Sequence, residues 1–301
     1  MKKQANIFCV VVTCNGMKWL PKHIESIKNS FYPLKSVYVD NGSTDGTKEF
    51  LKNDFPEAIL IELNNNLGFG NANNIGVKYA IENAADYVFL FNQDAYLEPE
   101  TIGNCFRGFG LQKNIALVSP IHLNGDGSAL DIGFQRCIVE ELCPGFLSDL
   151  VLKKTREAYP IYSVNAAAWL LKTEIVNRIG LFSNAFFHYG EDINFQQRLK
   201  YFGFKALVVP DAFILHDREE RNGEKSELGK KIEIKTNQMT ILMDINESFT
   251  STKKKVWKYA GLLLFEGKFL KSFSLVLDTY WNSNKYLKWR EQMKKELSLQ
   301  K

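Results

Sequence analysis

The stretch NIFCVVVTCNG, Asn6–Gly16, decides the fold. Its first seven residues form a continuous apolar run, which is typical of a strand buried on both faces of a sheet. Two lysines precede the run, as in a signal peptide, but no small-residue cleavage site follows it, so we interpret it as a first strand. The polar residues that follow directly predict a loop where this strand ends.

Strand and helix patterns alternate outward from this run. Strands are predicted at Ser36–Asp40, Ala58–Leu63 and Asp86–Phe91, and helices at Pro21–Asn29, Thr44–Lys52 and Phe69–Asn83. We expect Ser43 or Thr44 to cap the second helix, with Asp45 in its first turn. This alternation predicts right-handed βαβ units, a mostly parallel twisted sheet and an α/β fold class.

The pattern becomes less regular after Pro99. The later part of the chain predicts helices at Pro99–Phe109 and Glu191–Phe202, strands at Ile115–Pro120, Ser163–Leu171 and Lys205–Leu215, a Gly-rich hairpin at His122–Gln135, a charged loop at Arg218–Lys231, and two or three helices in Phe249–Lys301.

Composition excludes several classes of protein. The chain has 301 residues, of which 45% are hydrophobic and 24% charged, so it is neither disordered nor collagen-like. Its five cysteines contain no CxxC pair, which predicts reduced, buried thiols and no zinc site. No apolar run reaches the roughly 18 residues of a membrane span.

The charge is unevenly distributed. The net charge is +4, but residues 246–301 hold 12 Lys and Arg against five Asp and Glu, which leaves 26 basic and 29 acidic residues in the rest. A slightly acidic body with a basic tail predicts contact of the tail with an anionic surface and does not indicate a nucleic-acid-binding protein.

Polar clusters lie where the predicted strands end, and ligands bind at that edge of a parallel sheet. Asp40–Asp45 either recognises a base through Asp40 or is only a capped turn. The Gly- and Asn-rich Asn65–Gly76 either binds phosphate at a helix start or packs through small residues. Asp94, after the strand Tyr87–Phe91, either binds Mg²⁺ or Mn²⁺ or closes an Asx turn.

Two further positions allow catalytic or structural interpretations. Glu191 and Asp192 at a predicted helix start either complement the helix dipole or supply a general base. His216, after the apolar run Ala212–Leu215, is either a structural hydrogen-bonding group or a metal ligand.

Five strings in order resemble the inverting glycosyltransferase family 2, in particular its rhamnosyltransferase-like branch. They are VVVTCNG (Val10–Gly16), VDNGSTDGT (Val39–Thr47), NNLGFGNANNIG (Asn65–Gly76), FLFNQDAYLEP (Phe89–Pro99) and GLFSNAFFHYGEDINFQQRLKYFGF (Gly180–Phe204), followed by His216. The resemblance implies a GT-A fold in residues 1–245, with a nucleotide-binding half (1–98) and an acceptor half (99–245), and a separate basic, amphipathic helical tail (246–301).

The resemblance also implies an enzyme that transfers a sugar from a nucleotide-diphosphate donor, dTDP-rhamnose or a UDP-hexose, with Mn²⁺ or Mg²⁺ as cofactor. Asp192 would be the catalytic base, with Glu191 beside it, and Asp94 and His216 the metal ligands. Trp169, which otherwise is a core aromatic, and His188 would contact the acceptor or sugar. The implied donor-binding residues are Thr13, Asn15, Asp40, Asn41, Gly68, Asn73, Asn74, Asn92 and Lys235.

Three departures from the family pattern bear on this assignment. The metal-binding DxD element reads Asn92-Gln93-Asp94, so one carboxylate is missing. Cys14 replaces a tyrosine, which weakens a stacking role in that loop. Lys235 stands near the place of an Arg-Asn pair, and lysine offers a point charge where arginine offers a bidentate fork.

The tail interleaves lysines with aromatic and leucine residues over 253–295. It predicts either an amphipathic segment on an anionic membrane or a helical pair that packs on the body or forms a homodimer. The membrane interpretation suits a lipid-linked glycan acceptor and a cytoplasmic enzyme, peripheral on the inner membrane. Alternatives to the enzyme are a non-catalytic nucleotide-sugar-binding subunit and a nucleotidyltransferase, whose basic phosphate loop is absent after the first strand.

Overall fold

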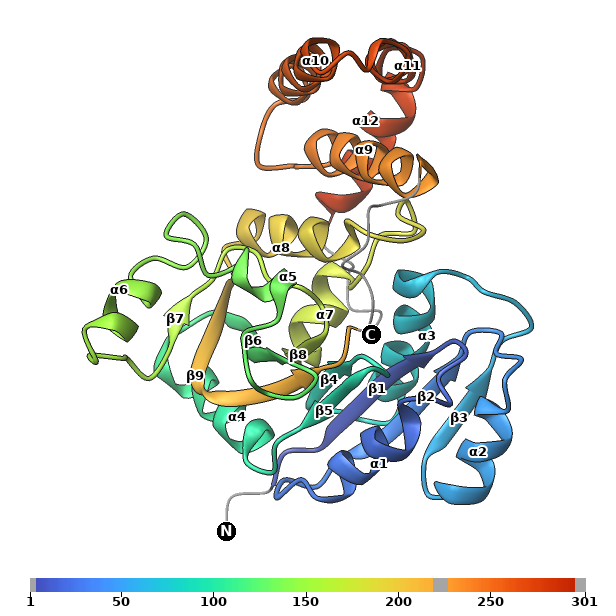
Figure 1. Cartoon of the computed structure of the whole chain (residues 1–301), viewed down its shortest axis with the longest axis vertical. Helices are drawn as coiled ribbons and strands as arrows, with labels where there is room; N and C mark the ends of the chain where they lie inside the picture. The colour runs from blue at the N-terminus through green and yellow to red at the C-terminus, as the bar shows by residue number, and fades with distance from the viewer. Residues whose placement is uncertain (1–3, 219–226, 296–301) are drawn as a thin grey trace.

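The computed structural model describes residues 4–218 and 227–295. Within these residues one nine-stranded sheet runs through the body of the molecule (Figure 1). Its strands are β1 (Ile7–Thr13), β2 (Lys35–Asp40), β3 (Ile59–Glu62), β4 (Tyr87–Phe91), β5 (Ala95–Leu97), β6 (Ile115–Asn124), β7 (Tyr159–Pro160), β8 (Ala168–Lys172) and β9 (Lys205–His216).

The sheet is mixed. Along the sheet the order is β3-β2-β1-β4-β8-β6-β9-β5, and β7 pairs with β9 beside this path. The first four strands are parallel to one another, which confirms the predicted βαβ units. β8 is antiparallel to both β4 and β6, so the second half of the sheet departs from the parallel pattern.

Helices cover both faces of the sheet (Figure 1). In this body they are α1 (Leu20–Lys28), α2 (Thr47–Asp54), α3 (Phe69–Glu82), α4 (Thr101–Leu111), α5 (Ile132–Gln135), α6 (Phe146–Val151), α7 (Thr173–Ile179) and α8 (Glu191–Tyr201). Residues of α1, α2 and α4 share one core with the sheet, and residues of α3, α7 and α8 share the other. Alternate residues of β1 enter the two cores, which explains its unbroken apolar sequence.

Four predicted elements are corrected. α2 begins only at Thr47, because the Asp45 carboxylate accepts hydrogen bonds from the backbone and hydroxyl of Thr47 and so closes a turn first. β6 continues to Asn124 into the predicted hairpin, and β8 begins at Ala168. The charged loop Arg218–Lys231 includes residues 219–226, which lie outside the described part, while 227–231 are helical.

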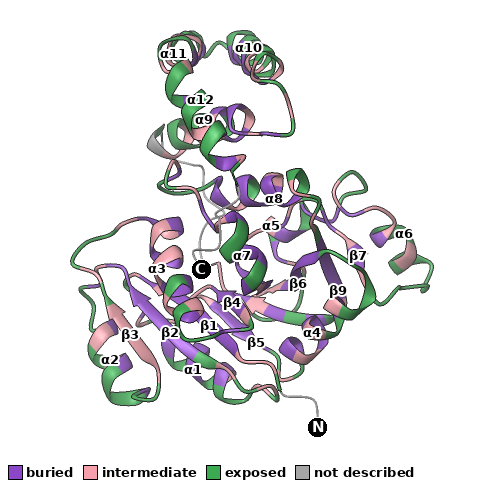
Figure 2. Cartoon of the chain, turned by 180° about the vertical axis from the view of Figure 1, so that it is seen from behind, coloured by how far each residue is buried: buried purple, intermediate pink, exposed green. Residues whose placement is uncertain are grey.

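A second layer of helices lies beyond α8 (Figures 1 and 2). It contains α9 (Glu227–Leu242), α10 (Phe249–Phe265), α11 (Phe269–Trp281) and α12 (Ser283–Met293). A third apolar cluster joins them, with buried residues Leu242, Val256, Ala260, Leu275 and Tyr286. The predicted boundary between a catalytic domain (1–245) and a tail (246–301) falls inside this cluster, which has buried residues on both sides of it. The division into these two parts therefore stays a prediction.

None of the helices in the described residues is both long enough and apolar enough to cross a membrane.

Candidate functional site

A cavity of about 700 Å³ opens at the carboxyl ends of the central strands. Its walls come from loops that follow β1, β2 and β4, from the start of α8, from the end of β9 and from α9. Nine of the predicted site residues line it: Asn41, Gly68, Asn92, Asp94, His188, Glu191, Asp192, His216 and Lys235. The chain therefore brings predicted acidic, imidazole and carboxamide groups to one hollow.

Strand pairing brings Asp94 to His216. Ala95 pairs with His216 across the antiparallel β5 and β9, so the residue before Ala95 lies beside the imidazole. The His216 Nε2 atom is 3.3 Å from Asp94 Oδ1 and 3.5 Å from the amide nitrogen of Asn92. Both predicted metal ligands thus face the cavity from adjacent positions.

Behind His216 lies a buried acidic group, Asp131. Its Oδ1 accepts a hydrogen bond from the Phe134 backbone and caps α5, and its Oδ2 is 2.8 Å from Arg218 Nε and 3.7 Å from His216 Nδ1. Arg218 Nε also donates to His216 Nδ1 at 3.2 Å. The imidazole is therefore held between one carboxylate at the cavity wall and another beneath it.

Glu191 and Asp192 begin α8 on the same cavity. Glu191 is 5% exposed, and its Oε2 atom has no hydrogen-bond partner among the described residues. Burial, and then the neighbouring Asp192 charge, raise the pKa of Glu191 to about 7. Burial also raises the pKa of Asp192, although hydrogen bonds from the Ile193 and Ala166 backbone oppose that rise. A carboxylate pair with raised pKa values suits proton transfer at neutral pH.

Asn41 and Gly68 belong to a wall of the cavity that is made of loops. The Asn41 amide donates to Asn66 Oδ1 at 3.0 Å, and its own oxygen accepts from the Leu67 backbone at 2.8 Å. Gly68 has a φ of +84°, and a Cβ at this position would lie 2.1 Å from the Phe187 carbonyl oxygen. Glycine is required here because two loops of the cavity approach through their backbones.

Three predicted donor-binding residues support this wall from below. Thr13 and Asp40 have no exposed surface, and the Thr13 hydroxyl donates to Asp40 Oδ1 at 3.3 Å. Asp40 Oδ2 accepts from the Ser43 backbone, and Asn15 Oδ1 accepts from the Thr44 backbone. These side chains do not line the cavity; they fix the turn that presents Asn41.

The remaining three predicted residues are also away from the cavity. Asn73 donates to the Phe69 carbonyl within α3, and Asn74 exchanges two hydrogen bonds with the Phe182 backbone. Trp169 has no exposed surface and packs against Phe182 and Phe195. The structure therefore corrects the predicted sugar contact of Trp169: it is a core aromatic.

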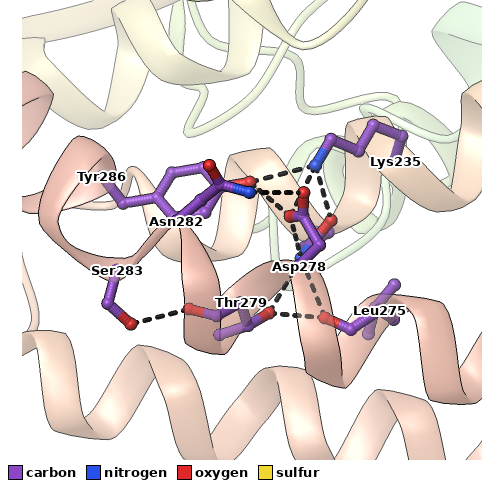
Figure 3. A network of polar contacts seen from close by, with 8 residues as sticks. Lys235, Leu275, Asp278, Thr279, Asn282, Ser283 and Tyr286 are labelled. Carbon is purple, nitrogen blue, oxygen red and sulfur yellow. Dashed lines mark hydrogen bonds and ion pairs between the residues drawn. The ribbon is translucent and has the colours of Figure 1, made fainter.

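α9 closes the cavity from the helical layer. Ile232, Lys235, Thr236 and Met239 line it. The Lys235 ammonium donates to Asp278 at 2.6 Å and to the Tyr286 hydroxyl at 3.0 Å (Figure 3). The predicted diphosphate ligand thus also has a carboxylate partner in α11.

Comparison with known proteins shows which family the chain resembles. Residues 8–137 match the model described as "Glycosyl transferase family 2". This segment of the chain is therefore similar to glycosyltransferase family 2. This glycosyltransferase is 24% identical over 211 residues to the "N-acetylglucosaminyl-diphospho-decaprenol L-rhamnosyltransferase" of Mycobacterium tuberculosis, which covers 64% of the chain and 69% of the relative. It is 23% identical to the "dTDP-rhamnosyl transferase RfbF" of Shigella flexneri, over 70% of the chain and 69% of the relative.

Solved structures confirm the GT-A fold of this glycosyltransferase. The mannosyltransferase PcManGT of Pyrobaculum calidifontis, in complex with GDP-Man and Mn²⁺, matches with a TM-score of 0.58 and 15% identity over 97% of this chain and 85% of that one. S. aureus TarS 1-349 in complex with UDP matches with a TM-score of 0.55 and 17% identity over 82% of this chain and 68% of that one.

The donor atoms of the glycosyltransferase suit a divalent ion only in part. A carboxylate oxygen and an imidazole nitrogen 3.3 Å apart are ligands that Mn²⁺ accepts. Within the described residues no three His, Cys, Asp or Glu side chains gather in a metal-binding group. Asp94 and His216 therefore fit an ion that takes its other ligands from water or from a bound diphosphate.

Sequence reasoning missed several residues at this site of the glycosyltransferase. Asp131 carries no motif, and its place behind His216 arises only because α5 follows β6 back toward β9. Arg218 was predicted only as part of a charged loop. Of the wall made by α9, only Lys235 was predicted, through the family resemblance, and Ile232, Thr236 and Met239 were not.

Proposed function

We propose that this glycosyltransferase transfers a sugar from a nucleotide-diphosphate donor to a hydroxyl group of a growing, lipid-linked cell-surface glycan, with inversion at the anomeric carbon. One observation carries the proposal: Asp94 and His216 line the same cavity as Glu191 and Asp192. Asp94 and His216 would hold a divalent ion that offsets the charge of a diphosphate. Glu191 and Asp192 suit the removal of a proton.

Asp192 supplies the base in this proposal. Its Oδ1 accepts from the Ile193 backbone at 2.8 Å, which holds the carboxylate at the start of α8. The acceptor oxygen bonds to the anomeric carbon, its proton passes to Asp192, and the bond from that carbon to the diphosphate oxygen breaks. A single displacement of this kind inverts the configuration through an oxocarbenium-like transition state.

The departing diphosphate carries negative charge that the site must offset. Asp94 and His216 would hold Mn²⁺ or Mg²⁺, and a bound ion there neutralises the leaving diphosphate. Lys235 and Arg218 place two further cationic side chains on the cavity. Asn41, Asn66 and Asn92 add carboxamide groups for the ribose or phosphate oxygens.

The names of the relatives reduce the range of candidate donors and acceptors. Two are named as rhamnosyltransferases, one of them for dTDP-rhamnose, and a third is the "Low-salt glycan biosynthesis hexosyltransferase Agl10" of Haloferax volcanii, 22% identical over 60% of the chain and 59% of the relative. We therefore rank dTDP-rhamnose first and UDP-hexoses second. The name of the mycobacterial relative supports an acceptor that carries N-acetylglucosamine on a diphospho-lipid.

The experiment is a donor panel on the full chain. dTDP-rhamnose, UDP-glucose, UDP-galactose and UDP-N-acetylglucosamine are compared with and without Mn²⁺ for the rise in melting temperature, because a true donor stabilises the folded state by mass action. The stabilising donor is then incubated with a lipid-linked N-acetylglucosamine acceptor, and the anomeric configuration of the product is read by NMR.

Each outcome decides between functions. A product of opposite anomeric configuration supports inversion, and a product of retained configuration overturns it. A donor that stabilises the chain but gives neither transfer nor hydrolysis would identify a non-catalytic binding subunit. Asp94→Asn should lower the donor affinity measured with Mn²⁺ about 10- to 100-fold and so reduce the rise in melting temperature. Asp54 is exposed, and the control Asp54→Asn should leave that affinity unchanged.

A further inference from the structure

The turn between α10 and α11 carries a large apolar surface. Six of its residues have exposed fractions between 45% and 95%: Leu262 55%, Leu264 45%, Phe265 95%, Phe269 66%, Leu270 87% and Phe273 66%. We call these six residues the hairpin tip. They lie at the end of the helical layer that is remote from the sheet (Figure 1). An apolar group this large on a surface marks an interaction site more often than an isolated exposed leucine does.

The geometry of the turn holds the hairpin tip in place. Gly267 has a φ of +75°, and its N–H donates to the Leu264 carbonyl, while the Lys268 N–H donates to the Leu263 carbonyl. This pair of bonds ends α10 with a Schellman motif. The Ser272 hydroxyl donates to the Ala260 carbonyl at 2.8 Å and joins the two helices. The exposed side chains therefore sit on an ordered, hydrogen-bonded hairpin.

The helical segment that carries the hairpin tip is rich in basic side chains. Between residues 249 and 295 the sequence has eleven Lys and Arg and three Asp and Glu. Lys258 is exposed on α10, and Lys268 and Lys271, at the start of α11, have partly exposed side chains that pair with Glu266 and Glu227. An excess of basic residues in a segment with exposed phenylalanine and leucine is complementary to an anionic lipid headgroup layer over acyl chains.

We propose that the hairpin tip inserts into the interface of an anionic membrane, with Phe265, Phe269 and Leu270 among the acyl chains and the lysines at the headgroups. Trp257 and Trp281, 53% and 73% exposed, lie further along the two helices and suit the headgroup level, where indole rings accumulate. The surface does not require that the chain be catalytic, so its test is separate from that of the proposed function.

The insertion would also orient the cavity. α9 lines the cavity through Lys235 and is tied to the hairpin by hydrogen bonds from Gln238 to the Leu275 carbonyl, the Thr279 hydroxyl and Asp278. Figure 3 shows Asp278 at the centre of this network, with Lys235 and Tyr286. A membrane-bound hairpin would thus hold the sugar-transfer site at a fixed angle to the lipid surface, which suits a lipid-linked acceptor.

The experiment is sedimentation of the full chain with vesicles. Pure phosphatidylcholine vesicles are compared with vesicles of about one-third phosphatidylglycerol, in low and high salt. The wild type should bind the anionic vesicles and be released by salt. The double variant Phe265→Ser/Leu270→Ser should lower the partition coefficient about tenfold or more, because two large apolar groups no longer enter the lipid.

The matched control is Phe31→Ser. Phe31 is 76% exposed in the loop after α1, a helix that lies at the opposite end of the molecule from α10 and α11 (Figure 1), so its loss should leave vesicle binding unchanged. Melting temperature and donor hydrolysis should be unchanged in both variants, because the substituted side chains are exposed. Absence of binding to anionic vesicles, or equal binding by the double variant, would overturn the proposal. So would a dimer in light scattering that the double variant dissociates, since the hairpin tip would then bind a second copy.

Discussion

His216 and Asp94 lie in side-chain contact, with Nε2 of the imidazole 3.3 Å from Oδ1 of the carboxylate. The contact follows from the pairing of β5 with β9, which sets His216 opposite Ala95. Each residue alone allowed a structural interpretation. Together, at a cavity wall, they offer a divalent ion two adjacent donor atoms. Substitutions of this pair's neighbours and of other cavity residues therefore test the proposed site directly.

Asp131→Asn should weaken divalent-ion binding without unfolding the protein. Asparagine keeps the oxygen that accepts from the Phe134 backbone, but it loses the negative charge opposite Arg218 and His216. Asp131 pairs with Arg218, whose Nε donates to His216 Nδ1, so loss of the charge should loosen the imidazole and lower Mn²⁺ affinity about 10-fold. The measurement is Mn²⁺ titration in the presence of the nucleoside diphosphate, with the melting temperature as the check on folding.

Asp131→Glu supplies the second arm of this test, because it restores the charge. A role through His216 predicts partial recovery of Mn²⁺ affinity in the glutamate variant. Equal loss in both variants, accompanied by a lower melting temperature, would mean that Asp131 serves α5 alone.

Glu191→Gln should remove a pH-dependent part of the stability. The pKa of Glu191 is about 7 in the folded chain against an ordinary 4.5, so the folded state binds the proton more tightly. Its contribution is fully present below about pH 4.5 and is lost as pH rises through 7. The shift corresponds to roughly 3 kcal/mol of unfolding free energy.

Denaturant unfolding at several pH values between 4.5 and 8 measures this difference. The glutamine variant should show a shallower fall in unfolding free energy over that range than the wild type. Parallel curves for the two proteins would contradict a buried, largely protonated Glu191.

Asp192→Asn should abolish transfer and leave donor binding nearly intact. The substitution keeps size and polarity but removes the proton acceptor, whose contribution is typically 10²- to 10⁴-fold in rate. The measurements are nucleoside diphosphate release in the presence of acceptor and donor affinity by thermal shift. If donor binding were lost as well, Asp192 would belong to the donor site and another group would have to be the base.

Gly68→Ala should damage both stability and donor binding. Gly68 has φ 84° and ψ 163°, a conformation open almost only to glycine, and the added methyl group would lie 2.1 Å from the Phe187 carbonyl oxygen. We expect a loss of roughly 3 kcal/mol in unfolding free energy. Chemical denaturation and donor titration measure the two effects.

Gly103→Ala is the matched control for the glycine. Gly103 lies within α4, and a Cβ there would meet no atom within 4 Å. Because alanine favours a helix interior more than glycine does, the control should gain about 1 kcal/mol. A Gly68→Ala protein as stable as this control would show that the two cavity loops do not need their close backbone approach.

Most of the body's secondary structure was predictable because local patterns decide it. The apolar runs at β1, β2 and β4 read as strands since both faces of the sheet are covered by helices. The predicted start of α2 was wrong because the Asp45 side chain closes a turn before the helix. A capping pattern in the sequence does not distinguish such a turn from an N-cap.

The candidate site was predictable where a chemical group stands at a strand end or helix start, as with Asp94, Asp192 and His216. It was not predictable where burial decides the matter. Asp40 and Asn41 are neighbours, yet Asp40 has no exposed surface while Asn41 lines the cavity. Trp169 could have faced a sugar or the core, and only the packing of α8 over β8 placed it in the core.

The sequence by itself determined the parallel half of the sheet, the family resemblance and the chemical types present at the strand ends, because these depend on periodicity and short strings of residues. The tertiary structure alone decided which of those groups share a cavity, that Asp131 lies behind His216, and that α9 forms a wall. The reason is physical: strand pairing and side-chain packing join residues distant along the chain, and no local pattern encodes their distance or their exposure to solvent.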